Sequence, residues 1–197
     1  MDPAVPRLPP GQHLTKLWPV LSIDPTPYFD GKKWDVTVEG EVEHPRTFTW
    51  QELTSKDLRE EDISDFHCVT SWSRYDNHWA GVSMRKVAEI VKPKKSAKFV
   101  NFYSVGFYMT SMTTENALAP HVMMVYEWEG KPLAPEHGGP LRVITPHLYA
   151  WKGAKWLRKI TFEKEEELGF WEVRGYSQTA NPWKVDARGQ EIDRYSF

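Results

Sequence analysis

The sequence of 197 residues contains a single cysteine, Cys68, so it cannot form an internal disulfide. This absence fits a reducing compartment. Residues 1–11 are rich in proline and contain neither an apolar signal core nor a twin-arginine pair. No apolar run is long enough to span a bilayer. We therefore expect a cytoplasmic protein without a membrane span, and a periplasmic one only if a signal segment has been removed.

Long basic segments are also missing. The net charge is −2, and the best basic cluster, residues 92–95 (KPKK), is short and typical of a solvated turn. The sequence has no basic amphipathic helix that would bind a polyanion. These features argue against nucleic acid or an anionic membrane surface as the main partner.

Several common catalytic motifs are absent. The sequence has no glycine-rich phosphate loop of the Walker or dinucleotide type, and Ser71 and Ser73 are not flanked as a nucleophile elbow requires. A structural zinc site needs several cysteines or histidines at ligand spacing. The only compact group is His67, Cys68 and His78, which argues against structural zinc.

Aromatic residues, in contrast, are abundant: 10 Trp, 8 Tyr and 9 Phe make up 14% of the chain. Rings at this density suit a large core or a pocket with flat walls. The length suits one domain. Residues 1–30 are predicted to be a proline-rich arm, held by apolar side chains such as Trp18 on a single domain of residues 31–197.

The remaining pattern mixes strands with short helices. Alternation predicts strands at residues 34–39, 99–103, 141–145 and 156–162, and residues 122–128 fit a strand or a short helix. Thr49 and Ser83 are predicted helix N-caps, with Pro93 ending the second helix, and residues 114–118 fit one helical turn. Residues 135–140 are predicted to be an irregular loop. No βαβ rhythm appears, so the predicted fold class is α+β.

Cys68 lies in the segment FHCVTSWS, residues 66–73, which we expect to be the end of a strand running into a loop. A lone cysteine is most often an inert, buried residue. The alternative is a reactive thiol paired with a histidine that is distant in the sequence. Seven histidines make such a pair easy to form but do not identify it.

A second informative region comprises residues 137–142 (HGGPLR) and 152–156 (KGAKW). Paired glycines let a backbone approach a ligand closely. Arg142 offers planar donors, Lys155 offers a point charge, and free amides around Gly153 would complete a phosphate cradle. The alternative is two surface turns with solvated cations.

Taken together, these segments resemble a known family. The ordered blocks are residues 34–40, 66–73, 79–82 (WAGV), 97–100 (AKFV), 137–142 and 149–156 (YAWKGAKW). In this order they are similar to the sulfite-oxidase-type molybdopterin oxidoreductases, in particular to their short stand-alone domains. That group includes the catalytic subunit of a bacterial methionine-sulfoxide reductase. The resemblance runs from about residue 9 to residue 183.

The resemblance implies a sulfite-oxidase-like fold that binds one molybdenum–molybdopterin per chain. Cys68 would be the thiolate ligand to molybdenum, a soft donor suited to that metal. The residues implied to hold the pterin and its phosphate come from the loops and from the arm: Ser104, His137, Arg142, Gly153, Ala154, Lys155, Lys16 and Trp18.

The implied activity is transfer of an oxygen atom and two electrons to or from a small sulfoxide, sulfite or N-oxide. Candidate walls or proton donors near the metal are Trp72, Arg74, Tyr108 and Tyr149. A separate haem or flavin protein is expected to exchange the electrons. The chain lacks the family's dimerisation domain, so a monomer is expected. Two alternatives are a non-catalytic molybdopterin-binding module and a cofactor-free Cys/His thiol enzyme.

Overall fold

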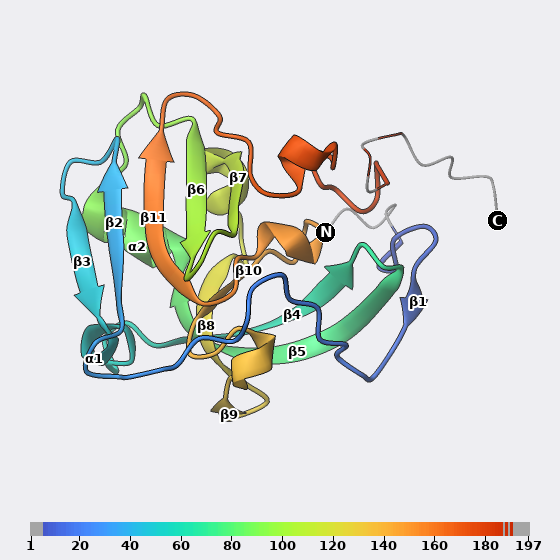
Figure 1. Ribbon diagram of the computed structural model, residues 1–197, viewed down its shortest axis with the longest axis horizontal. Coiled ribbons are helices and arrows are strands. Elements are labelled where there is room, and N and C mark those ends of the chain that lie inside the picture. Colours follow the sequence, from blue (N-terminus) through green and yellow to red (C-terminus); the bar gives the residue numbers. More distant parts are fainter. Residues whose placement is uncertain (1–5, 187, 189, 191–197) are drawn as a thin grey trace.

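A computed structural model of the protein describes residues 6–186, 188 and 190. The chain forms two mixed β-sheets and several short helices, as Figure 1 shows, which confirms the predicted α+β class. One sheet has the order β1-β5-β8-β10, with β4 paired to β5 and β9 paired to β8. Its strands are β1 (His13–Leu14), β4 (Glu60–Cys68), β5 (Trp72–Ser83), β8 (Met123–Trp128), β9 (Lys131–Pro132) and β10 (Arg142–Ile144).

The second sheet has the order β3-β2-β11-β6-β7. Its strands are β3 (Arg46–Thr49), β2 (Asp35–Gly40), β11 (Leu157–Glu163), β6 (Phe99–Ser104) and β7 (Met109–Thr113). The alternation predicted near residue 34 is present, because Val36 and Val38 of β2 are fully buried. β11 pairs in parallel with β2 and antiparallel with β6, so it lies in the middle of the sheet.

The short helices begin where the sequence predicts. Thr49 and Glu52 form a reciprocal capping box at the start of α1 (Trp50–Leu53). Ser83 caps α2 (Met84–Val91), which buries Met84, Val87 and Val91 and ends before Pro93. The other helices are α3 (Thr114–Ala117) and the 3-10 turns η1 (Pro135–His137), η2 (Ala150–Lys152) and η3 (Glu172–Arg174). η1 lies in the segment predicted to be irregular.

The main difference from the sequence prediction is the long hairpin of β4 and β5. Its alternation is masked by a register shift between Ser64 and Phe66 and by the polar stretch from Arg74 to His78. Within residues 122–128, left open between strand and helix, Met123–Trp128 form strand β8. β7 was not predicted either. The hairpin is the element that carries Cys68, so it positions the site.

The N-terminal segment crosses the molecule before it enters β2, as the blue trace in Figure 1 shows. β1 pairs in parallel with β5, and Trp18 packs edge-on against Phe66, Trp79 and Trp128. Because Trp79 and Phe66 are buried, Trp18 extends an internal cluster of the protein. The segment therefore contributes to the core and to one wall of the cavity described below.

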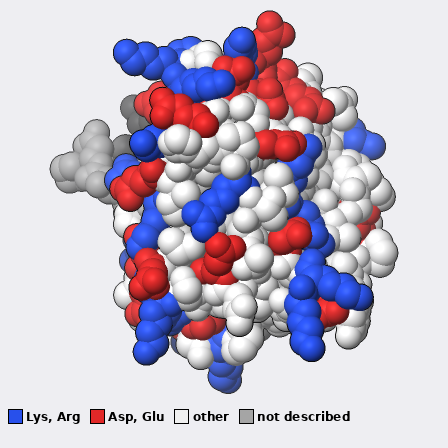
Figure 2. All heavy atoms as spheres, turned by 90° about the vertical axis from the view of Figure 1, so that its left-hand side faces the viewer, with Lys and Arg blue, Asp and Glu red and all other residues white. Residues whose placement is uncertain are grey.

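Figure 2 shows the face of the molecule on which β3 lies, and basic and acidic side chains are intermixed across it. Two ion pairs join β11 to β2: Arg158 with Asp35 at 2.6 Å and Lys159 with Glu39 at 3.1 Å. Exposed pairs of this kind contribute little stability. In the described part of the chain, no helix is long and apolar enough to cross a membrane.

Candidate functional site

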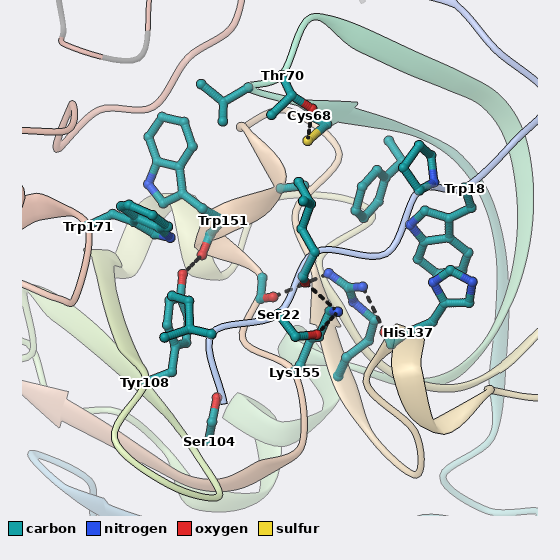
Figure 3. Close-up of a pocket in the computed structure, with 18 of the residues that line it drawn as sticks. Trp18, Ser22, Cys68, Thr70, Ser104, Tyr108, His137, Trp151, Lys155 and Trp171 are labelled. Atoms are coloured by element: carbon teal, nitrogen blue, oxygen red, sulfur yellow. Dashed lines mark hydrogen bonds between the residues drawn. The ribbon is translucent and has the colours of Figure 1, made fainter. Parts of the chain in front are cut away.

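A cavity of about 430 Å³ opens between the N-terminal segment, the β4–β5 turn and the C-terminal segment. Its volume is in the range of small-molecule and cofactor sites. Figure 3 shows Cys68 and Thr70 at one end, Ser104 at the other, and Ser22 and Lys155 between them. Other lining residues include Trp18, Asp24, Phe66, Trp72, Tyr108, His137, Arg142, Trp151, Gly153, Trp171 and Tyr176.

Cys68 is the last residue of β4, and a tight turn holds it at the cavity. The Ser71 amide donates to the Cys68 carbonyl, and Ser71 adopts φ +70°, as expected for a three-residue hairpin loop. The sulfur lies 3.1 Å from Thr70 Oγ1. The described residues place no histidine at hydrogen-bond distance from the sulfur. The turn therefore presents a thiol, 8% exposed as a residue, without a general base beside it.

A network of polar side chains stabilises the turn that follows Cys68. Gln12 Nε2 donates to the Cys68 carbonyl at 2.9 Å, which leaves Gln12 Oε1 to accept from Ser73 Oγ at 2.8 Å. Ser73 Oγ must then accept from His67 Nδ1, also at 2.8 Å. Burial lowers the pKa of His67 to about 4, so the imidazole is neutral at pH 7. His67 thus supports the turn and does not face the thiol.

Arg142 on β10 supplies a buried positive charge. Its guanidinium donates to the backbone carbonyls of His137 at 2.8 Å, of Gly153 at 3.3 Å and of Val143 at 3.3 Å. No carboxylate within the described residues pairs with it. Burial lowers the pKa of Arg142 to about 10. A guanidinium has five N–H donors, so two of them and the whole charge are left for an anion.

Lys155 ties the N-terminal segment to the η1 loop. Its Nζ donates to the Leu21 carbonyl at 2.6 Å, to Ser22 Oγ at 2.9 Å and to the Glu136 carbonyl at 2.7 Å. Burial, reinforced by the charge of Arg142, lowers the pKa of Lys155 to about 7. The two cations therefore repel each other across the cavity wall, which favours an anionic ligand between them.

The glycines of the two predicted cofactor loops allow close packing of the backbone. A Cβ on Gly139 would lie 2.0 Å from the Leu133 carbonyl oxygen, and one on Gly153 would lie 2.3 Å from that of Val143. Gly138 adopts φ +107° and closes η1. The Gly153 amide, which the sequence predicts to be free for a phosphate, instead donates to the Ala150 carbonyl. Gly153 lines the cavity, but its N–H group is occupied.

The structure brings most of the predicted site residues together. Nine of them line the cavity: Trp18, Cys68, Trp72, Ser104, Tyr108, His137, Arg142, Gly153 and Lys155. His137 stacks on Trp18 at 4.1 Å, and the Tyr108 hydroxyl donates to the Trp151 carbonyl. Burial raises the pKa of Tyr108 well above its ordinary value, so the phenol stays protonated. Their individual roles in binding or catalysis remain predictions.

Four predicted residues are not among those that line the cavity. Ala154 is fully buried, and Tyr149 stacks on Trp151. Arg74 bonds to Asn77 and Glu129 and lies over the Trp128 ring. The exposed Lys16 offers only its carbonyl, to Arg74 Nε at 3.4 Å. For Arg74 and Tyr149, contacts with neighbouring side chains hold the side chain outside the cavity lining.

Sequence reasoning missed several residues that line the cavity. The N-terminal segment contributes Leu21, Ser22 and Asp24, in addition to the predicted Trp18. The C-terminal segment contributes Trp171 and Tyr176, which pack on Trp151 or on each other. For Trp171 and Tyr176, the abundance of aromatic residues in the sequence was the only available signal. Contacts between segments that are far apart in the sequence leave no local pattern.

A model of the oxidoreductase molybdopterin-binding domain matches residues 23–171. The chain belongs to this family of molybdopterin-binding oxidoreductases. The match covers most of the chain and includes Cys68 and both cavity cations. The family resemblance predicted from the ordered sequence blocks is therefore confirmed.

Similar proteins support the same family membership. The chain is 42% identical over 179 residues to the uncharacterized oxidoreductase YuiH of Bacillus subtilis, with 90% of each chain covered. It is 29% identical to the protein-methionine-sulfoxide reductase catalytic subunit MsrP of Campylobacter jejuni, over 73% of this chain and 54% of that protein. For MsrP of Ralstonia nicotianae the identity is 27%, over 76% and 51%. The chain thus spans about half the length of these MsrP subunits.

A solved structure gives the same fold. The sulfane dehydrogenase SoxCD from Paracoccus pantotrophus matches with a TM-score of 0.67 and 16% identity, over 86% of this chain and 46% of that one. At this identity the likeness establishes the fold alone. It confirms the predicted sulfite-oxidase-like architecture.

Proposed function

We propose that this chain is a mononuclear molybdenum enzyme that holds one molybdopterin and reduces a small sulfoxide. The observation that carries the proposal is the pairing of a cavity thiol, Cys68, with the buried guanidinium of Arg142, which has no carboxylate partner among the described residues. A soft thiolate donor and an uncompensated cation are what a metal dithiolene with a phosphate tail requires.

The lining residues fit that cofactor. Cys68 would bind the metal, and Arg142 and Lys155 would neutralise the phosphate. Trp18 and His137, stacked at 4.1 Å, would offer a flat surface to a ring. When bound, the cofactor supplies a centre that exchanges an oxygen atom and two electrons. Overall, a sulfoxide takes up two electrons and two protons and yields a sulfide and water.

The walls of the cavity favour a neutral sulfoxide over the sulfite anion. Arg74, the cation nearest to Cys68 in the sequence, is bound to Glu129 and is not part of the lining. Much of the lining of the same cavity is aromatic, and thioether-like groups pack well against such rings. They belong to Trp72, Trp151, Trp171 and Tyr176. The MsrP relatives, named as methionine-sulfoxide reductases, support the same substrate class.

Electrons for this reaction must come from outside the cavity. We propose a separate haem or flavin protein as donor, because a sulfoxide needs two electrons that no side chain of the described cavity supplies reversibly. We also propose that the enzyme is a monomer. Light scattering checks the monomer. Reduction of the loaded enzyme by a soluble dye would replace the natural donor in assays.

The test is production of the chain in a host that makes molybdopterin, followed by metal analysis and a sulfoxide reductase assay with reduced dye. Wild type is expected to carry about one molybdenum per chain and to reduce methionine sulfoxide. Cys68→Ser should lose activity by roughly a hundredfold or more, because a hard oxygen ligand shifts the metal's potential. Growth with tungstate is the matched control.

Three results would contradict the proposal. Wild type without molybdenum would exclude a molybdenum enzyme. Bound pterin without turnover on any sulfoxide, sulfite or N-oxide would indicate a non-catalytic binding module. Activity that survives growth in tungstate but is lost on alkylation of Cys68 would indicate a cofactor-free thiol enzyme.

A further inference from the structure

The sulfur of Cys68 has one hydrogen-bond partner among the described residues, the hydroxyl of Thr70. Thr70 Oγ1 lies 3.1 Å from Cys68 Sγ, and both residues line the cavity, as Figure 3 shows. Within the described part of the chain, this hydroxyl makes no other hydrogen bond. The two groups are therefore paired with each other at the point where the proposed metal would bind.

The β4–β5 loop, residues 69–71, fixes this contact. Cys68 and Trp72 are opposite each other in the hairpin, and the loop between them is short. Val69 packs against the larger core cluster, which anchors the loop. Thr70 is branched at Cβ, so few rotamers are available to its side chain. The hydroxyl is therefore held beside the sulfur by a short, anchored loop.

The loop does not need the Thr70 hydroxyl to keep its shape. Threonine side chains in turns often bond to nearby backbone groups. Here the Ser71 amide closes the turn by donating to the Cys68 carbonyl at 3.1 Å, and Gln12 Nε2 donates to the same carbonyl at 2.9 Å. The Thr70 hydroxyl points to the sulfur instead, which indicates a role toward that atom.

A bound metal would fix the direction of this hydrogen bond. A thiol and a hydroxyl can each donate to the other. A cysteine sulfur that binds a metal is a thiolate, which has no proton to donate. In the loaded protein the Thr70 hydroxyl must therefore donate and the Cys68 sulfur must accept.

We propose that Thr70 acts through Cys68: its hydroxyl donates to the thiolate and raises the reduction potential of the bound metal. This inference rests on the proposed function. A hydrogen bond to a ligand sulfur withdraws electron density that the sulfur would otherwise share with the metal. The lower oxidation state becomes relatively more stable. An external donor then reduces the centre more readily, and the reduced centre passes its electrons to a sulfoxide less readily.

The first experiment measures this potential by a redox titration of the loaded protein, monitored by electron paramagnetic resonance. Thr70→Val keeps the branched shape but has no donor. Loss of one hydrogen bond to a charged acceptor should lower the one-electron potential by about 59 mV, equivalent to a roughly tenfold change in the ratio of the two oxidation states. Thr70→Ala should give the same shift, and Thr70→Ser, which keeps the hydroxyl, should stay close to wild type. Only loaded centres give the signal, so incomplete loading does not alter the value.

The second experiment separates this electronic effect from a structural one. With a weakly reducing dye, Thr70→Val should reduce methionine sulfoxide roughly tenfold more slowly than wild type, because fewer centres are in the reduced state. With a strongly reducing dye the difference should disappear. A damaged fold or a lost cofactor would slow both reactions equally. Thr47→Val, the same substitution at an exposed position of β3, is the matched control and should equal wild type.

Equal potentials in wild type and Thr70→Val would overturn the inference. Equal shifts in Thr70→Val and Thr70→Ser would also overturn it, because side-chain shape and not the hydroxyl would then be responsible. In both cases wild type still carries molybdenum and turns over, so the proposed function stands. Wild type without molybdenum would refute the proposed function and this role of Thr70 together.

Discussion

Two opposing effects act on the Lys155 ammonium. Its hydrogen bonds connect the N-terminal segment to the η1 loop, whereas burial and the charge of Arg142 disfavour its protonated form. Burial alone makes an ammonium costly, and three hydrogen bonds compensate for part of that cost. The negative charge of Glu136 raises the pKa of Lys155, but this effect is too weak to restore the ordinary value. An anionic phosphate beside Lys155 would relieve the conflict.

This conflict predicts a pH dependence of the cofactor-free protein. The pKa of Lys155 is about 7 in the fold against 10.5 for an unperturbed lysine, so between these values the unfolded state binds more protons. Its contribution to the free energy of unfolding therefore rises with pH across that window. Urea unfolding at pH 7 to 9.5 should show a shallower rise in Lys155→Met than in wild type. Parallel profiles would contradict the assignment.

At the scale of elements, a buried ion pair joins two walls of the cavity. Lys152 of η2 donates to Glu172 of η3 and to the Ser111 carbonyl, and Thr110 Oγ1 also donates to Glu172. Both charged side chains are fully buried. The pair sits next to Trp151 and Trp171, which line the cavity. It therefore fixes the aromatic wall on which the proposed sulfoxide packs.

Breaking this pair should destabilise the whole fold. Lys152→Met leaves the Glu172 carboxylate buried and unpaired, which costs about 3–5 kcal/mol of unfolding free energy. The double variant Lys152→Met/Glu172→Leu should recover most of that loss, because no isolated charge remains. Chemical denaturation of the single and double variants measures both effects. A double variant as unstable as the single one would mean that packing, and not the charge, dominates.

At the scale of the whole molecule, the cavity is lined by both an N-terminal and a C-terminal segment of the described chain. The N-terminal segment reaches it through Trp18 and residues 21–24, and the C-terminal segment through Trp171 and Tyr176. A ligand in this cavity contacts segments that are far apart in the sequence. Binding should therefore hold these two segments in place together and raise the stability of the folded state.

Limited proteolysis tests this coupling. Lys16 is exposed just before Trp18, so trypsin should cut there readily in the cofactor-free protein. With cofactor bound, cleavage after Lys16 should slow roughly tenfold, because local opening of the segment would break ligand contacts. Cleavage after Lys56, in an exposed turn away from the cavity, is the internal control and should not change. Equal protection at both sites would contradict the coupling.

The sequence by itself determined the family and those local elements whose signals lie within a few residues of the chain. Capping residues such as Thr49 and Ser83 act within a few residues of the chain, so their helices could be predicted. The alternation in β2 was equally local. The blocks around Cys68, Arg142 and Lys155 kept the order that the family resemblance requires, and the family match confirmed it.

Only the tertiary structure decided which side chains meet. It moved Arg74 out of the cavity through contacts with Asn77 and Glu129, and it occupied the Gly153 amide within η2. It also brought Asp24 to the Gly106 turn, although 82 positions separate them in the numbering. Such contacts depend on how both sheets and both chain ends pack together. Burial and hydrogen-bond competition in three dimensions, which no local pattern encodes, therefore define the site around Cys68.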